Sequence, residues 1–112
     1  MKQNKDNIDD LNILRKIQNN PKVSQRKLAA ELGFSLGKIN YCLSALKTKG
    51  LIKINNFKRS KHKINYFYII TPKGFIKKTN LTLKFMKLKI QEYDELQKEL
   101  EKELEKENNK KK

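Results

Sequence analysis

Side chains that can contact nucleic-acid bases are concentrated between Ser35 and Lys47. Lys38 can donate to O6 and N7 of guanine, and Asn40 can pair with N6 and N7 of adenine. Tyr41 can meet a thymine methyl group or a phosphate. These residue types predict a helix that reads bases in the major groove. The predicted contact residues in this segment are Ser35, Leu36, Gly37, Lys38, Asn40, Tyr41, Ser44 and Lys47.

Two further groups of residues are suited to phosphate. Gln25 and Arg26 stand near the start of the preceding helical segment, where backbone contacts usually occur. Residues 55–63 (NNFKRSKHK) hold four cations and no acid. These cations are Lys58, Arg59, Lys61 and Lys63. A basic segment of this kind suits phosphates, and a solvated hairpin end is the alternative.

Three short helices are predicted to hold these residues. Apolar residues at helical spacing predict a first helix over residues 8–19. Ser24 can cap a second helix that Gly33 ends, and Ser35 can cap a third that ends at Gly50. The residues expected to face inward are Ile8, Leu11, Ile13, Leu14 and Ile17 in the first helix, Leu28, Ala29 and Leu32 in the second, and Ile39, Leu43 and Leu46 in the third.

The second and third helices are joined as in a helix-turn-helix. A turn of about three residues is typical of that motif, although many other helical hairpins share it. Residues 51–54 and 64–70 are rich in β-branched and aromatic residues, which predicts two strands joined by a loop at 55–63. A β-hairpin directly after a helix-turn-helix is a wing. The predicted fold class is mainly α with a small β-hairpin (α+β), a winged helix-turn-helix followed by a long coiled-coil-like helix.

One long helix is predicted after the wing. Thr71 can cap it and Pro72 suits its first position, and no later Pro interrupts the chain before about Glu107. An a/d seam with one polar position follows, formed by Leu83, Met86, Ile90, Tyr93, Gln97, Leu100 and Leu104. The seam predicts a homodimer, and a helix folded back on its own domain is the alternative. The predicted division is 1–71 for the winged helix-turn-helix, 72–107 for the dimerisation helix and 108–112 for a disordered basic tail.

Charge is distributed unevenly along the chain, whose formal net charge is +15. Residues 1–91 hold 21 basic and 4 acidic side chains, whereas residues 92–107 hold 3 basic and 8 acidic ones. A basic front suits a polyanion, and AT-rich codons are the alternative explanation for part of the lysine excess. Lysines that precede the acids along the long helix favour an antiparallel pair of such helices, because each cationic half then lies beside an acidic half.

Composition argues against several classes of protein. One His and one Cys cannot supply a four-ligand zinc site, and Cys42 is expected to be a small buried side chain. No paired-carboxylate site, nucleophile triad or glycine-rich phosphate loop is present, so we expect no enzyme, no cofactor and no metal. His62 is expected to touch phosphate or water. No run approaches the ~20 apolar residues of a membrane span, and we expect a cytoplasmic, nucleoid-associated protein.

The stretches SLGKINYCL, NNFKRSKHK and TPKG resemble winged-helix transcriptional regulators of the multiple antibiotic resistance regulator (MarR) type. Within that type they are most similar to the short, bacterial group called MarR-family EPS-associated transcriptional regulators. The resemblance covers about residues 8–105 and implies a homodimer that binds operator DNA, with a link to exopolysaccharide genes. Compared with longer MarR-type proteins, the chain is expected to lack the flanking helices that help to form their small-molecule pocket, so the resemblance leaves the effector unknown.

The favoured function is therefore a dimeric, DNA-binding transcription regulator. Two alternatives remain open at this point. One is a non-specific nucleic-acid-binding protein, chaperone-like or RNA-binding, and the other is a winged-helix protein-interaction module.

Overall fold

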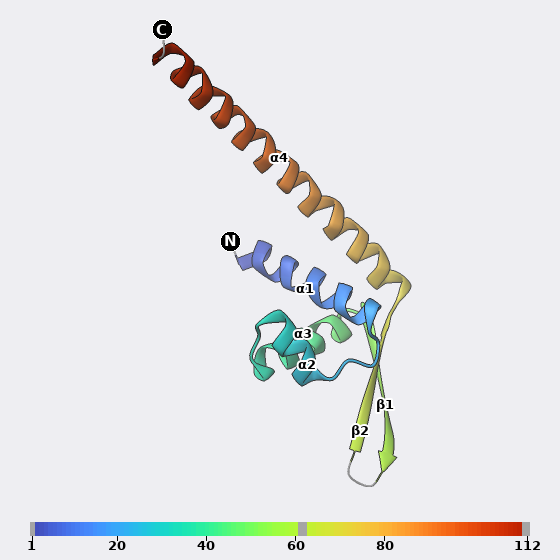
Figure 1. Cartoon of the computed structure of the whole chain (residues 1–112). Coiled ribbons are helices and arrows are strands. Elements are labelled where there is room, and N and C mark those ends of the chain that lie inside the picture. Colours follow the sequence, from blue (N-terminus) through green and yellow to red (C-terminus); the bar gives the residue numbers. More distant parts are fainter. Residues whose placement is uncertain (1, 61–62, 111–112) are drawn as a thin grey trace. The chain divides into compact units, whose positions relative to one another are not determined.

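The computed structural model describes residues 2–60 and 63–110, with the side chains of residues 7–56 and 66–110. Helices and one antiparallel hairpin make up this part of the chain (Figure 1), so the predicted fold class is confirmed. The elements are α1 (Lys2–Asn19), α2 (Gln25–Leu32), α3 (Leu36–Thr48), β1 (Ile52–Ser60), β2 (Lys63–Ile70) and α4 (Pro72–Lys110).

Side-chain caps begin α2 and α3 at the predicted residues. The Ser24 hydroxyl oxygen accepts a hydrogen bond from the backbone N–H of Lys27 at 3.1 Å. Ser35 does the same for Lys38, also at 3.1 Å. Gly33 ends α2 with a φ of 72°, in the left-handed region that glycine adopts without strain. Each serine cap stabilises its helix by about 1 kcal/mol, so the turn between α2 and α3 is specified locally.

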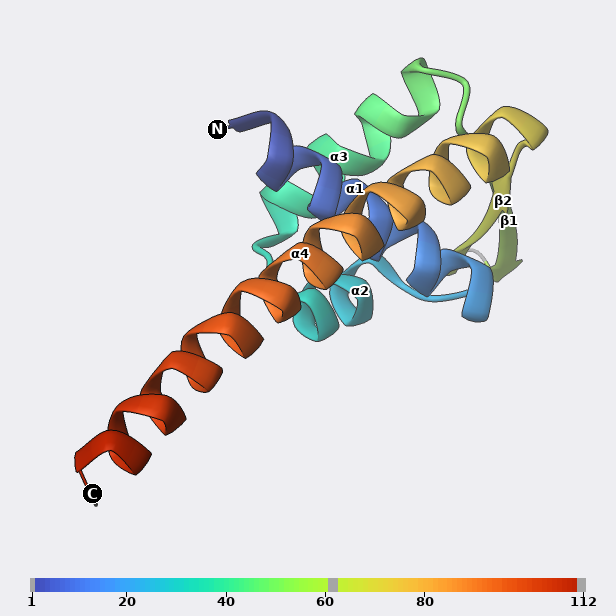
Figure 2. The same ribbon diagram turned by 90° about the horizontal axis from the view of Figure 1, so that it is seen from above.

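The core lies among α1, α2, α3 and the base of the hairpin, which leads away from these helices (Figures 1 and 2). Its buried residues are Ile13, Leu14, Ile17, Val23, Leu28, Ala29, Ile39, Leu43, Leu46, Leu51, Ile52, Tyr68 and Ile70. The prediction was wrong for Ile8, which is 42% exposed. The buried face of α1 runs through Asp9, Ile13 and Ile17 at steps of four residues, and this rotation leaves Ile8 at its edge.

The wing is longer than predicted. β1 and β2 pair antiparallel from Ile52 opposite Ile70 to Ser60 opposite Lys63, with an irregularity between Lys58 and Ser60. Most of the predicted loop at 55–63 is therefore strand. Asn and Lys have low strand propensity, but cross-strand pairing overrides so weak a preference. Residues 61–62, which include Lys61 and His62, lie outside the described part of the chain.

The long helix is continuous from Pro72 to Lys110, a length of about 58 Å at the usual rise per residue. The expectation of disorder was wrong for residues 108–110, because no Gly or Pro ends the helix there. The chain divides into two compact units, Met1–Leu81 and Thr82–Lys112. The boundary falls after Leu81 rather than after residue 71, since Leu81 is only 3% exposed.

A junction of backbone groups joins the end of α3, the hairpin and the start of α4. The Thr71 hydroxyl donates to the carbonyl oxygen of Gly50 at 2.7 Å and accepts the backbone N–H of Gly74 at 3.0 Å. The Thr71 N–H donates to the Leu51 carbonyl at 3.1 Å. A Cβ at Gly74 would overlap that carbonyl and lie 2.8 Å from Cγ2 of Ile70. Only glycine lets the first turn of α4 approach so closely.

We therefore expect Gly74→Ala to lower the free energy of unfolding by about 1–3 kcal/mol, because the added methyl group overpacks the junction. Urea unfolding of the full chain, at one protein concentration, measures the change. Gly37→Ala is the matched control, since a Cβ there meets nothing nearer than the Ser35 hydroxyl at 4.0 Å. Equal effects of the two substitutions would contradict the close approach at Gly74.

Candidate nucleic-acid interface

A hollow of about 440 Å³ lies where the starts of α2 and α3 face β2. It is lined by Ser24, Gln25, Arg26, Leu36, Gly37, Asn40 and Tyr66. Five of these residues were predicted from sequence as contact residues, so the fold gathers them on one surface. Ser24 was predicted only as a helix cap. Tyr66 was missed, although strand alternation with Tyr68 could have placed it on the inner face of the hairpin.

The outer face of α3 is open to solvent. Ile39, Leu43 and Leu46 are buried, which turns the intervening positions outward. Tyr41 is 76% exposed and Leu36 is 48% exposed. The other exposed residues from the predicted set are Ser35, Gly37, Asn40, Ser44 and Lys47. This face has the polar and apolar groups that base edges require.

Two helix starts border the hollow. The first N–H groups of a helix have no partner within the helix and carry its positive dipole end. Gln25 and Arg26 stand in the first turn of α2, and Leu36 and Gly37 stand in the first turn of α3. An anion in the hollow would therefore face N–H groups and a guanidinium together, which suits a phosphate.

Gly37 is not required by the packing of the chain itself. A Cβ at this position would have open space around it, because its nearest neighbour is 4.0 Å away. Glycine inside a helix costs about 0.5–1 kcal/mol relative to alanine. The cost is incurred at an exposed position beside the hollow, where a missing side chain allows a ligand to approach the backbone of α3.

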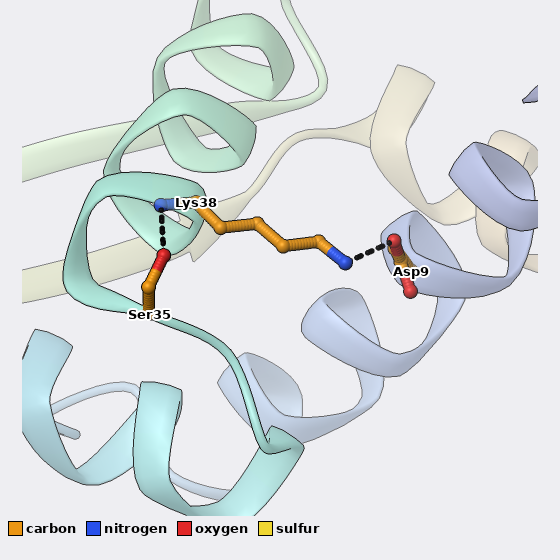
Figure 3. Close-up of polar contacts among 3 residues, drawn as sticks. All are labelled: Asp9, Ser35 and Lys38. Atoms are coloured by element: carbon orange, nitrogen blue, oxygen red, sulfur yellow. Dashed lines mark hydrogen bonds and ion pairs between the residues drawn. The ribbon is translucent and has the colours of Figure 1, made fainter.

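Lys38 is held on the other side of α3 (Figure 3). Its ammonium lies 3.1 Å from Oδ2 of Asp9 on α1 and 4.0 Å from the centre of the Phe34 ring. It lines a second hollow, of about 140 Å³, together with Asp9, Asp10, Tyr41, Cys42, Ala45 and Lys49. The structure thus places Lys38 differently from the guanine contact predicted for it. Cys42 in this hollow is half-buried.

Tyr68 anchors the base of the hairpin to the core. It is 1% exposed, and its backbone N–H donates to the carbonyl of Pro21 at 2.9 Å. Its buried hydroxyl makes no hydrogen bond of good distance and angle among the described residues. Burial raises the pKa of this hydroxyl above its ordinary value, while the nearby Gln25 side chain acts in the opposite direction. The hairpin base and the turn before α2 are thereby held together.

The basic residues of the wing remain a prediction. Lys58, Arg59 and Lys63 stand on the strands at the far end of the hairpin, but their side chains are outside the described set. Lys61 is outside the described residues altogether. In Figure 1 this end of the hairpin extends away from α1, α2 and α3. A DNA molecule bound beside these helices could therefore contact the end of the hairpin.

The described residues hold neither a cluster of metal ligands nor a membrane-spanning helix. Nowhere among them do three or more His, Cys, Asp or Glu side chains gather as metal ligands would. None of the helices described is long and apolar enough to cross a membrane.

Comparison with known proteins shows what this arrangement is similar to. Residues 8–53 match the family model described as winged helix-turn-helix DNA-binding. No curated protein matches the chain in sequence.

Similar folds occur in solved structures of regulators. BldR of Sulfolobus solfataricus has a TM-score of 0.65 at 22% identity, over 87% of this chain and 72% of BldR. Staphylococcus aureus MarR, in complex with salicylate and kanamycin, has a TM-score of 0.61 at 22% identity, over 77% of this chain and 56% of MarR. Streptococcus pneumoniae FabT, in complex with DNA, has a TM-score of 0.58 at 22% identity, over 79% and 59%.

This chain spans little more than half the length of the MarR and FabT proteins. Identities of this size show a common fold. The helices within residues 8–53, which match the winged helix-turn-helix model, and the hairpin that follows them thus form a winged helix-turn-helix fold similar to that of the MarR-type regulators.

Proposed function

We propose that the chain is a DNA-binding transcription regulator that reads operator DNA with α3 and holds the phosphate backbone with the start of α2 and the wing. The observation that carries the proposal is the hollow where Gln25, Arg26, Gly37 and Asn40 meet. It combines an amide that can read a base with a cation and helix starts that can bind phosphate. FabT, which is similar in fold, was solved in complex with DNA.

The exposed face of α3 fits the major groove. That groove is about 12 Å wide and admits an α-helix, whose first residues then contact base edges. Gly37 and Asn40 stand in the first two turns of α3, and Ser44 and Lys47 stand farther along. Asn40 is the proposed adenine contact, while Ser44 and Lys47 are proposed to contact the phosphates.

Two acidic side chains in the basic part of the chain, Asp9 and Glu31, pair with lysines of neighbouring helices. Asp9 pairs with Lys38 across α1 and α3 at 3.1 Å. Glu31 pairs with Lys16 across α2 and α1 at 3.5 Å. These pairs reduce the repulsion that a DNA phosphate would meet, so the surface around the hollow stays attractive to a polyanion.

The proposed regulator acts as a homodimer through α4. The seam residues from Leu83 to Leu104 are exposed in the single chain, with Leu83 at 52%, Tyr93 at 66% and Leu100 at 58%. An apolar row of this length on one helix marks an interaction surface, and its a/d spacing suits a second copy of the same helix. The change from lysine to acid near Ile90 supports an antiparallel pair.

The resemblance to the short EPS-associated group adds exopolysaccharide genes as the proposed targets. The genes beside this one, and the DNA selected by the purified protein, test that assignment directly.

Asn40→Ala is expected to cost about 1–3 kcal/mol at the selected operator and little on random DNA, because one base contact is lost. Fluorescence anisotropy at fixed salt measures both affinities. Replacing Lys58, Arg59, Lys61 and Lys63 with Gln is the contrasting variant. It is expected to weaken binding to both DNAs and to flatten the salt dependence. Equal losses for Asn40→Ala on the two DNAs would favour the non-specific class of protein instead.

Gly37→Ala is expected to separate stability from binding. The fold gains about 0.5–1 kcal/mol, because alanine is the better helix former, while operator affinity falls because the methyl group holds α3 away from the DNA. Urea unfolding and anisotropy on the same preparation give the two values. Unchanged affinity in the stabilised variant would show that Gly37 does not approach the DNA.

Leu100→Gln combined with Leu104→Gln is expected to produce a monomer that binds the operator weakly, since two half-sites are no longer engaged together. Sedimentation equilibrium measures the mass of the complex. Lys98→Gln combined with Lys102→Gln, off the seam of the same helix, is the matched control and is expected to stay dimeric. A dimer that survives both seam substitutions would place the interface elsewhere.

A further inference from the structure

We propose that Lys38 is a positioning residue that ties α3 to α1, and that α3 consequently reads A·T rather than G·C base pairs. The inference rests on the proposed function, because it names the base pairs that the same interface would take.

The contacts of Lys38 occupy its ammonium group. Nζ lies 3.1 Å from Oδ2 of Asp9 and 4.0 Å from the centre of the Phe34 ring. The Asp9 side chain is 12% exposed, and that of Lys38 is 36% exposed. A carboxylate so deeply placed needs a partner. If Lys38 turned to a base, Asp9 would be left without this partner and the cation–π contact with Phe34 would be lost.

Figure 3 shows the Lys38 side chain extending from α3 to Asp9 on α1, while its backbone N–H points to the Ser35 hydroxyl. The residue therefore does two positional tasks. Its backbone N–H completes the cap of α3, and its side chain fixes the angle between α3 and α1.

Different residues of α3 line the two hollows. Leu36, Gly37 and Asn40 line the larger hollow, which faces the proposed DNA surface. Lys38 and Tyr41 line the smaller hollow, on the side of α1. In the larger hollow α3 thus offers the DNA an apolar side chain, a bare backbone and an amide, without the cation of Lys38.

This set of groups selects A·T pairs. Guanine is read most often by Arg or Lys, which donate to O6 and N7, whereas Asn pairs with N6 and N7 of adenine. An apolar side chain such as Leu36 suits the methyl group of thymine. Arg26 is the remaining cation that borders the larger hollow. It stands in the first turn of α2, from which helix-turn-helix proteins reach the phosphates.

The test is selection from a random duplex pool by the full-length protein, followed by affinity measurement on the selected site. The wild type is expected to enrich A·T pairs at the positions that α3 covers. Lys38→Gln is expected to select the same sequence, because the ammonium reads no base, and to bind every DNA more weakly by a similar factor, because α3 loses its tie to α1. Asp9→Asn frees the ammonium, so it should bind random DNA more tightly, with a salt slope steeper by about one.

Three control variants complete the experiment. Asp9→Glu keeps the carboxylate and is expected to behave as wild type. Asp9→Asn combined with Lys38→Gln is expected to lose the gain in random binding. Arg26→Gln is expected to weaken binding to every sequence without altering base preference. Circular dichroism reports whether each variant folds. If Asp9→Asn does not fold, the sequence selected by Lys38→Gln alone decides whether Lys38 reads a base.

Several results would overturn the inference while leaving the regulator function intact. The clearest is a guanine selected by wild type and lost by Lys38→Gln, with affinity for that site reduced roughly 5- to 150-fold. A guanine preference that Arg26→Gln abolishes would overturn it as well. If the wild type selects no sequence from the pool, the proposed regulator function itself fails.

Discussion

The backbone at Gly50 and Leu51 is the constraint on which the arrangement of the other elements depends. Gly50 turns the chain out of α3 with a φ of 75°, and the Leu51 N–H then bonds to the Leu46 carbonyl at 3.0 Å. The Leu51 carbonyl accepts a hydrogen bond from the N–H of Thr71. Leu51 comes directly before β1 and Thr71 directly after β2, so this bond closes the base of the hairpin. The end of α3, the hairpin and the first turn of α4 therefore share one set of satisfied backbone groups.

Electrostatics contributes to the fold and to the proposed function at the same time. Few acids stand in the strongly basic part of the chain, and two of them join helices by ion pairs. The Lys16–Glu31 pair is well exposed, with 43% and 36% of the two side chains accessible, so it contributes little to stability. Asp9 is far less exposed and depends on its lysine. In this strongly basic part of the chain, the carboxylates of Asp9 and Glu31 thus connect α1 to the neighbouring helices.

Most of the helical fold could be predicted from the sequence, because its signals are local. Ser24 and Ser35 are followed at once by the N–H groups that they cap, and Gly33 ends α2 by its own conformation. The extent of the wing could not be predicted, since strand pairing across residues 55–60 is decided by the partner strand. The same holds for Lys38: its type suggested a guanine contact, but its place depends on Asp9, which only the tertiary fold brings near.

The position of Asp9 has an evolutionary consequence. The residue lies on α1, outside the helix that would face the DNA, yet its carboxylate lies 3.1 Å from the ammonium of Lys38 on that helix. Two descendants of such a protein could keep α3 identical and still diverge in the promoters they recognise, through a single codon change in the part of the gene that encodes α1. Orthologues grouped by their recognition helices alone would then be assigned the same regulon when their regulons differ.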